Sequence, residues 1–236
     1  MSPSTLDPGR LPRHVGIIMD GNGRWARQQG KARTEGHLEG GKAAKRVVAA
    51  AAELGLPFLS LYVFSTENWA RTAEEVSYLM FLVRSNLRKE LDFYSRNGIR
   101  IVHSGDLAGL PPEISREIED VSRETAGFEG LTLNLAINYG GRDEILRAVH
   151  RAQAAGTAAG LTQESFRAHL DQPAIPDPDL VIRTGGERRL SNFLLWESAY
   201  AELYFSAKLW PDWDRQDLVD ALVDYCGRSR RFGGAE

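Results

Sequence analysis

The sequence predicts an α/β fold, in which a single domain is built around a mainly parallel central sheet of about six strands with flanking helices. Short apolar runs rich in Val, Ile, Leu and Tyr alternate along the chain with longer stretches of helical periodicity. The chain has 236 residues, of which 42% are hydrophobic and 26% are charged. This length and composition are sufficient for one sizeable core and exclude a disordered chain.

Strands are predicted wherever a short apolar run is rich in β-branched and aromatic residues. Because long connections separate these runs, neighbouring strands are expected to lie parallel. The predicted strands are His14–Met19, Phe58–Phe64, Ile99–His103, Leu131–Ile137, Leu180–Arg183 and Glu202–Phe205.

Helices are predicted in the stretches between the strands. Ala43–Leu54 is rich in Ala and ends before Gly55, and Glu75–Asn97 has a broad apolar face and ends before Gly98. The other predicted helices are Pro111–Arg123, Arg142–Ala154 and Gln163–Leu170, and the predicted loops are Gly156–Thr162 and Pro173–Pro178.

Composition excludes several classes of protein. The formal net charge of −3 provides no basic field, so nucleic acid is not an expected partner. The single cysteine, Cys226, cannot form an intrachain disulfide or a Cys-rich metal site. The charge-free stretch Leu54–Thr66 is shorter than the about 20 residues of a membrane span, and residues 1–13 lack a signal-peptide core. We expect a cytoplasmic protein with a flexible segment at residues 1–13.

The first predicted strand leads into the glycine-rich turn Asp20-Gly21-Asn22-Gly23-Arg24-Trp25-Ala26. The carboxyl ends of parallel strands are where open α/β sheets bind ligands. Glycines allow backbone N–H groups to approach an anion, and Arg24 can bind phosphate oxygens. Asp20 would repel phosphate unless a divalent cation, Mg²⁺, lies between them. The alternative is a tight turn with an Asp cap.

Two nucleotide-binding motifs are matched only in part. Gly21-x-Gly23-x-x-Ala26 fits the dinucleotide fingerprint, but no acidic residue ends the second strand at the expected distance. Gly36-x-x-x-x-Gly41-Lys42 lacks the Ser or Thr of a P-loop and no strand precedes it. A nucleotide hydrolase is therefore rejected. A nicotinamide-dependent oxidoreductase stays an alternative hypothesis, which a measurement of NADH binding would test.

Two further groups of polar residues extend this predicted anion site. Arg33 and His37 can reach the same anion if the segment Gln28–Gly36 folds back over the turn. The second strand ends in a cluster of polar and aromatic residues at the same edge of the sheet. Its members are Ser65, Asn68, Trp69 and Arg71, and Thr72-x-x-Glu75 forms a capping box for the next helix.

The fifth strand ends in a second candidate phosphate site. Residues 183–192 contain three arginines, two glycines and a serine, among them Arg183, Arg189 and Ser191. Guanidinium groups and backbone amides suit phosphate, so two such sites predict two phosphorylated ligands. Glu202, at the start of the last strand, is a second carboxylate that could complete a metal site with Asp20. The alternative to the phosphate site is a charged loop exposed to solvent, and the alternative to the metal site is a Glu202 side chain exposed to solvent.

Five segments of the chain resemble the cis-prenyltransferase family, and closely its bacterial undecaprenyl diphosphate synthases. The segments are residues 14–26 (HVGIIMDGNGRWA), 64–69 (FSTENW), 138–142 (NYGGR), 179–187 (DLVIRTGGE) and 199–205 (AYAELYF). The resemblance implies a homodimeric Mg²⁺-dependent enzyme that repeatedly condenses isopentenyl diphosphate onto farnesyl diphosphate. The expected product is undecaprenyl diphosphate, the lipid carrier precursor for cell-wall synthesis.

The resemblance also implies roles for individual residues. Asp20 and Glu202 would bind the metal, and Asn68 with Ser65 would handle the departing proton. The allylic substrate would contact Gly21, Asn22, Gly23, Arg24, Trp25, Arg33, His37, Trp69, Arg71 and Glu75, and isopentenyl diphosphate would contact Arg183, Arg189 and Ser191. Arg188 stands where some relatives have His, and no role is assigned to it.

The resemblance divides the chain into a catalytic domain at 14–227 and a tail at 228–236. Arg231 and Gly233 in this tail are expected to contribute to the dimer and the phosphate site. An apolar tunnel for the product is expected between Ala43–Ala52 and Val76–Leu91, although core packing explains the same side chains. Transient membrane contact is expected for product release.

Two other functions stay open within the resemblance. One is a synthase with a short or medium-length product, since product length is not legible from the sequence. The other is a non-catalytic lipid-binding subunit, but such subunits typically lack the aspartate that is present here as Asp20. The absence of an Asp-Asp-x-x-Asp motif separates the chain from the trans-prenyl synthases.

Overall fold

Six strands form one parallel sheet, as the sequence predicts. The computed structural model describes residue 6 and residues 8–229. The strands are β1 (His14–Ile18), β2 (Phe58–Ser65), β3 (Arg100–Ser104), β4 (Thr132–Tyr139), β5 (Leu180–Arg183) and β6 (Glu202–Phe205). Their order is β3-β4-β2-β1-β5-β6, and every adjacent pair is parallel. The segments that follow the strands therefore meet at one edge.

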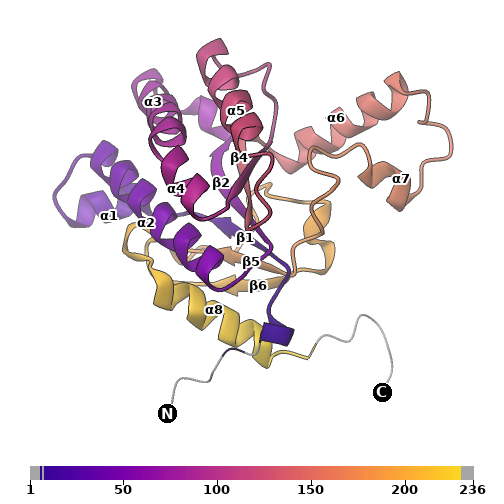
Figure 1. The fold of residues 1–236 in the computed structure, drawn as a ribbon. Coiled ribbons are helices and arrows are strands. Elements are labelled where there is room, and N and C mark those ends of the chain that lie inside the picture. The colour runs from indigo at the N-terminus through magenta and orange to yellow at the C-terminus, as the bar shows by residue number, and fades with distance from the viewer. Residues whose placement is uncertain (1–5, 7, 230–236) are drawn as a thin grey trace.

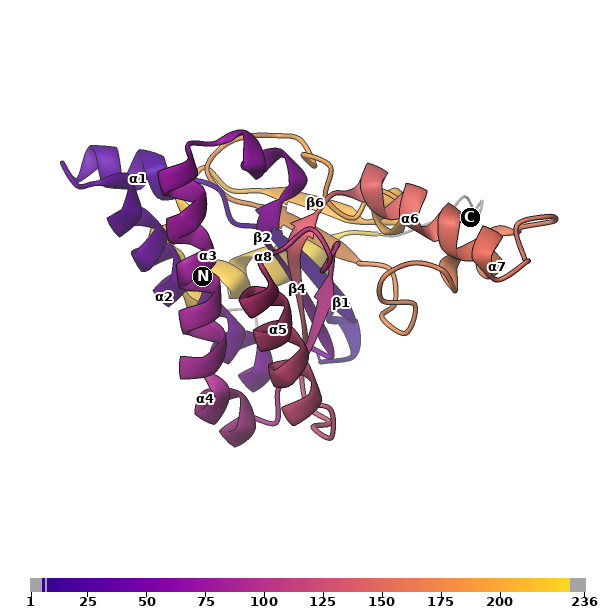
Figure 2. The same ribbon diagram turned by 90° about the horizontal axis from the view of Figure 1, so that it is seen from above.

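Helices connect the strands. They are α1 (Asn22–Gln28), α2 (Arg33–Glu53), α3 (Ala73–Lys89), α4 (Leu91–Arg96), α5 (Pro112–Glu124), α6 (Gly141–Ala154), α7 (Gln163–Arg167) and α8 (Arg215–Gly227). Short 3-10 helices are η1 (Pro8–Arg10), η2 (Thr66–Ala70), η3 (Glu197–Tyr200) and η4 (Trp210–Asp212). Helices α1 and α2 lie at one end of the molecule and α6 and α7 extend from the other (Figures 1 and 2).

Two parts of the core pack against the sheet, one on each face, and a third, of Ala148, Phe166 and Leu170, joins α6 to the α7 segment. The larger part joins the strands to α2, α3, α5 and α8, with Val47, Met80, Ile118 and Leu222 among its buried residues. The smaller part buries Ile18, Val181 and Tyr139 under Phe193 and Leu194, which belong to the loop after β5. This loop therefore packs on the sheet.

Helix α2 begins at Arg33, well before the predicted start at Ala43. The segment 33–42 is largely polar, so it shows no apolar face in the sequence. Gly36 and Gly40 are nevertheless buried, because α2 packs there against the backbone and side chain of Asn22. The expected fold-back of Gln28–Gly36 thus includes the first turn of a helix.

Three other helices differ from the prediction. Helix α1 begins at Asn22, within the segment Asp20–Ala26 that was predicted as a turn. The predicted helix Glu75–Asn97 is two helices, α3 and α4, separated at Glu90, whose carboxylate lies 2.5 Å from the Lys45 ammonium on α2. Helix α8 was not predicted, although its buried residues Leu218, Ala221 and Leu222 have helical spacing.

Buried polar side chains link four strands. Ser104 donates a hydrogen bond to Asn134 Oδ1 (3.0 Å), and Asn134 Nδ2 donates to Ser60 Oγ (3.1 Å). Ser60 Oγ lies 2.8 Å from His14 Nε2, and His14 Nδ1 lies 2.7 Å from the Pro176 carbonyl. Because a carbonyl only accepts, His14 carries its proton on Nδ1 and accepts from Ser60.

Within the segment expected to be flexible, Leu6 and Leu11 pack against the core. The expected roles of Arg231 and Gly233 lie outside the described residues. The side chains expected to wall a tunnel, such as those of Val47 and Met80, pack together in the larger core, and the tunnel stays a prediction. None of the helices among the described residues combines the length and apolarity that a membrane span requires.

Candidate active site

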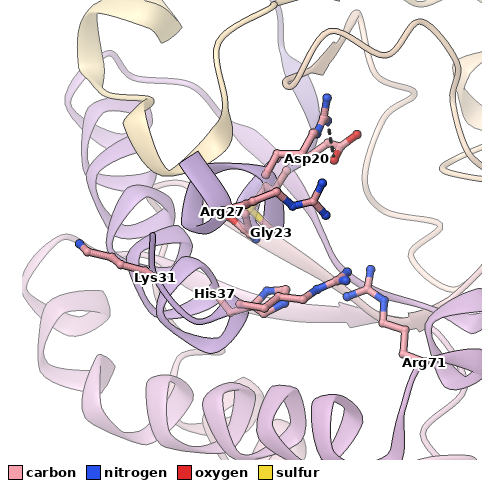
Figure 3. Close-up of a pocket in the computed structure, with 11 residues that line it drawn as sticks. Asp20, Gly23, Arg27, Lys31, His37 and Arg71 are labelled. Atoms are coloured by element: carbon pink, nitrogen blue, oxygen red, sulfur yellow. Dashed lines mark ion pairs between the residues drawn. The ribbon is translucent and has the colours of Figure 1, made fainter. Parts of the chain in front are cut away.

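A polar cavity of about 420 Å³ lies at the carboxyl edge of the sheet, where β1 ends and α1 and α2 begin. Figure 3 shows Arg27 and Arg71 directed toward the same space, whereas Lys31 points away from it. The lining residues are Met19, Asp20, Gly21, Asn22, Gly23, Arg24, Arg27, Lys31, Arg33, His37 and Arg71. The cavity therefore brings together eight residues that the sequence predicts for an anion site and gives them a strongly cationic lining.

Asp20 is held on both its backbone and its carboxylate. Thr184 Oγ1 donates to the Asp20 carbonyl (2.6 Å) and accepts from the Asp20 N–H (2.9 Å). One carboxylate oxygen lies 3.1 Å from Arg24 Nη2, and the other lies 3.0 Å from Arg183 Nη2. Arg183 is buried on β5, so Asp20 joins the two candidate phosphate sites.

Glycines allow the turn after Asp20 to pack closely. Gly21 has a φ of +121°, in the region that favours glycine. A Cβ on Gly36 would lie 2.1 Å from the backbone oxygen of Asn22, and one on Gly40 would lie 2.4 Å from Asn22 Oδ1. The near-match to a P-loop at Gly36–Lys42 thus has a packing role.

Glu75 is the centre of a charged cluster between the first turns of α2 and α3. Its Oε1 atom lies 3.0 Å from Arg33 Nε, 2.8 Å from Arg71 Nη1 and 3.3 Å from His37 Nε2. Burial lowers the pKa of His37 below its ordinary value by more than the hydrogen bond to Glu75 raises it, so the ring is neutral at pH 7. Glu75 thus fixes side chains that face the cavity.

The segment after β2 folds into η2. The Ser65 N–H donates to Asn68 Oδ1 (3.1 Å), which joins the two residues predicted to handle a proton. Trp69 is 40% exposed, and its Nε1 atom donates to Asn138 Oδ1 (2.7 Å) at the end of β4. Asn138 has a φ of +51° and also donates to the Asp106 carbonyl (2.8 Å). Asn138 thereby orients Trp69.

The loop after β5 contains the residues predicted for the second phosphate site. Arg183 Nη1 donates to the Arg189 carbonyl and to Ser191 Oγ, both at 2.6 Å. The Arg189 side chain points to Glu187, at 2.5 Å, and is largely exposed. Because Arg183 also contacts Asp20, the two candidate phosphate sites are adjacent.

Glu202 does not lie near Asp20 within one chain. In the sheet register, Glu202 pairs with Leu180, which pairs with Val15, so Glu202 is at the opposite end of the strands. At about 3.3 Å per residue, the offset along the strands is roughly 15 Å. Its carboxylate instead accepts from Arg228 Nη1 (2.7 Å). The predicted metal site of Asp20 with Glu202 is therefore wrong within one chain.

Trp25 is close to the cavity but does not line it in the structure. Its Nε1 atom donates to Asp212 Oδ1 (2.7 Å), and the Lys31 ammonium lies 4.9 Å from its ring centre. Its expected contact with the allylic substrate stays a prediction.

Sequence reasoning missed Arg27, Lys31 and Thr184. Arg27 and Lys31 follow Arg24 at intervals of three and four residues, a helical spacing that was a usable signal. Thr184 gave no such signal, because its contact with Asp20 joins segments 164 residues apart.

Comparisons with known proteins identify the family. The model of a family described as "Putative undecaprenyl diphosphate synthase" matches residues 18–233. The chain is 52% identical to an isoprenyl transferase of Treponema denticola over 94% of this chain and 98% of that protein. It is 47% identical to an isoprenyl transferase of Thermotoga maritima over 95% of this chain and 98% of that protein.

Solved structures agree with this result. A lavandulyl diphosphate synthase from Lavandula x intermedia, in complex with dimethylallyl diphosphate, has a TM-score of 0.91 and 34% identity, covering 95% of this chain and 99% of that one. A probable undecaprenyl diphosphate synthase from Campylobacter jejuni has a TM-score of 0.81 and 34% identity, covering 94% and 98%. The chain belongs to the isoprenyl transferase family of cis-prenyltransferases.

Proposed function

We propose that this protein transfers an allylic prenyl group repeatedly onto isopentenyl diphosphate with cis geometry and so makes a long-chain polyprenyl diphosphate. The observation that carries the proposal is the cationic cavity around Asp20, which adjoins the arginine loop after β5 through Arg183. Two adjacent anion sites suit a reaction between two diphosphates. Farnesyl diphosphate is the expected allylic substrate.

The first site suits the diphosphate that leaves. When the bond between C1 of the allylic group and the diphosphate oxygen breaks, negative charge grows on the leaving group. Arg24, Arg27, Arg33 and Arg71 line the cavity where this charge would develop. A lavender relative of the same fold binds dimethylallyl diphosphate, which supports an allylic diphosphate as a substrate of this protein.

The second site holds the group that attacks. The alkene of isopentenyl diphosphate forms a carbon–carbon bond to C1, and a proton then leaves the adjacent carbon. Arg183, Arg189 and Ser191 would bind its diphosphate, and Asn68 with Ser65 would handle the departing proton, which the released diphosphate can accept. Holding both reactants at adjacent sites removes much of the entropic cost of their encounter.

The residues present fit Mg²⁺ as an ion shared with a substrate. Asp20 offers a half-exposed carboxylate, and the described residues contain no group of three or more His, Cys, Asp or Glu that could hold a metal alone. Mg²⁺ in phosphate sites commonly takes one or two carboxylates together with phosphate oxygens. Asp20 would hold it, and the ion would neutralise charge on the departing diphosphate. Arg24 and Arg183 would orient the carboxylate.

The experiment is an extension assay with farnesyl diphosphate, radiolabelled isopentenyl diphosphate and Mg²⁺. We expect long labelled lipids from the wild type and a loss in turnover of roughly 10³ or more for Asp20→Ala, with the fold intact. Asp92→Ala, which removes an exposed carboxylate far from the cavity, is the matched control and should stay fully active. No extension by the wild type would reject the proposal, and a fully active Asp20→Ala would reject the role of Asp20.

Product length is the finer part of the proposal. Its expected value is near that of the undecaprenyl enzymes, and the product would serve as a lipid carrier precursor for the cell wall. The similar structures include both a lavandulyl and a probable undecaprenyl synthase, so the fold alone does not determine the product. Thin-layer chromatography of the dephosphorylated product gives its length. A product much shorter than undecaprenol would contradict this expectation.

We also propose that the enzyme is a cytoplasmic homodimer that contacts the membrane transiently for product release. Exposed apolar side chains on α6, η3 and β6 support an association surface, because Leu146, Tyr200 and Leu203 are 61%, 78% and 37% exposed. Light scattering would give the mass of a dimer, and a monomer at catalytic concentrations would contradict this part.

A further inference from the structure

Three segments that follow different strands meet at one side chain, that of Asn192. Its Nδ2 atom donates to Glu67 Oε1 (2.8 Å) in η2, which follows β2. Its Oδ1 atom accepts from the Arg142 N–H (2.9 Å), and its carbonyl accepts from the Gly141 N–H (2.6 Å), at the start of α6 after β4. Asn192 itself lies in the loop after β5.

The backbone around Asn192 is held in a rare conformation. Ser191, Asn192 and Leu194 have φ values of +48°, +65° and +46°, a region that side chains other than glycine rarely adopt. Such a conformation persists only where surrounding contacts hold it, and it is typical of functional loops. Gly140 belongs to the same arrangement, since a Cβ there would lie 2.7 Å from Asn192 Nδ2.

The same loop is fastened on its other side to the centre of the site. Arg183 Nη1 donates to Ser191 Oγ, and Arg183 Nη2 contacts Asp20 Oδ2 at 3.0 Å. The loop therefore lies between Asp20 and η2, which carries Asn68 and Trp69. A shift of this loop would change the separation of the two substrates.

The charge of Glu67 adds to the bond with Asn192. Burial alone would raise the pKa of Glu67, but hydrogen bonds from its own backbone and from Asn192, Ser65 and Thr66 outweigh burial and lower it. Glu67 is therefore ionised at pH 7. A hydrogen bond from a neutral amide to a carboxylate is stronger than one between neutral groups.

We propose that Asn192 is a positioning residue that fastens the loop of residues 188–192, which would bind isopentenyl diphosphate, to the η2 segment beside the allylic substrate. The proposal deepens the proposed function and rests on it. Because binding free energies are linked, filling one diphosphate site would order the loop and strengthen binding at the other.

The test exchanges donor and acceptor in the hydrogen bond between Asn192 and Glu67. Asn192→Asp keeps the size and the acceptor for Arg142 but replaces the donor with a carboxylate that repels Glu67. Glu67→Gln keeps an acceptor for Asn192 but removes the charge, so it should weaken the bond and show a smaller effect than Asn192→Asp. In the double variant, the introduced glutamine can donate to the introduced carboxylate, which restores the bond in the opposite direction.

The measurements are steady-state kinetics for both substrates and hydrogen–deuterium exchange of the peptides that cover residues 186–194. We expect Asn192→Asp to raise the KM for isopentenyl diphosphate roughly tenfold and to speed exchange in the loop. The double variant should recover to within about threefold of the wild type on both measurements. A merely structural role would only lower the amount of active enzyme. It would not raise the KM for isopentenyl diphosphate, and the double variant would not recover.

Other results would contradict either the positioning role of Asn192 or the proposed function. Unchanged exchange in Asn192→Asp overturns the proposal, and so does changed exchange with unchanged KM. A double variant that is as impaired as Asn192→Asp also overturns it. If the wild type shows no turnover and does not bind isopentenyl diphosphate in a calorimetric titration, the proposed function fails, and the positioning role fails with it. The exchange data still show in that case whether the bond to Glu67 orders the loop.

Discussion

Lowering the pH from 7 to 5 is expected to destabilise this protein through His14. The ring is 2% exposed, and burial lowers its pKa from 6.5 to about 4, more than the bond to the Pro176 carbonyl and nearby carboxylates raise it. Both ring nitrogens already have partners, and the Nε2 atom accepts from Ser60. Protonation would replace that acceptor with a donor and bury a charge.

The magnitude follows from the two pKa values. Because the unfolded chain binds the proton more tightly than the folded one, stability is full above pH 6.5 and falls as the pH drops from 6.5 to about 4. The complete loss is about 3 kcal/mol, because each pKa unit corresponds to about 1.4 kcal/mol. Between pH 7 and pH 5 the contribution of His14 is about 2 kcal/mol.

The assay is urea unfolding followed by circular dichroism at pH 7 and pH 5. His14→Gln removes the titration, so its loss of stability between these pH values should be smaller than that of the wild type by about 2 kcal/mol. His150→Gln, which removes an exposed histidine on α6, should lose as much as the wild type. Equal losses in the wild type and in His14→Gln would refute the reasoning.

Three further substitutions test the site. Gly36→Ala places a Cβ 2.1 Å from the Asn22 backbone oxygen, so it should lower the free energy of unfolding by about 1–3 kcal/mol in a urea titration. The control Gly227→Ala, whose Cβ would lie in open space, should lower it much less, and equal losses would contradict the packing argument. Glu75→Ala leaves three cationic or polar groups without their shared acceptor and should raise the KM for the allylic diphosphate roughly tenfold in steady-state kinetics; an unchanged KM would contradict its anchoring role. At Asn138, with φ of +51°, alanine should be less stable than glycine by about 1 kcal/mol in the same titration, and the reverse order would show that the backbone is not strained there.

The strands and the positions of the two candidate anion sites were predictable because their signals are local. Each strand is a short apolar run, and all six lie within about two residues of the predicted positions. The segment Asp20–Arg24 and the loop after β5 could be singled out because polar, glycine-rich segments follow directly after strands, although residues 22–24 are the first turn of α1. The parallel arrangement then places both at the same edge of the sheet.

Several features could not be predicted, because they depend on which segments become neighbours. The polar start of α2 is helical only because Gly36 and Gly40 pack against Asn22. Glu202 falls at the opposite end of the sheet because the register pairs it with Leu180, and no local pattern encodes that pairing.

The sequence by itself determined the fold class, the family and most of the residues around the cavity, since these follow from patterns within a few residues of one another. Only the tertiary structure decided that Thr184 holds Asp20, that Glu75 gathers Arg33 and Arg71, and that Asn192 joins three loops. These contacts link residues that lie far apart in the chain, and hydrogen bonds become specific only when packing and strand register bring donor and acceptor within about 3 Å.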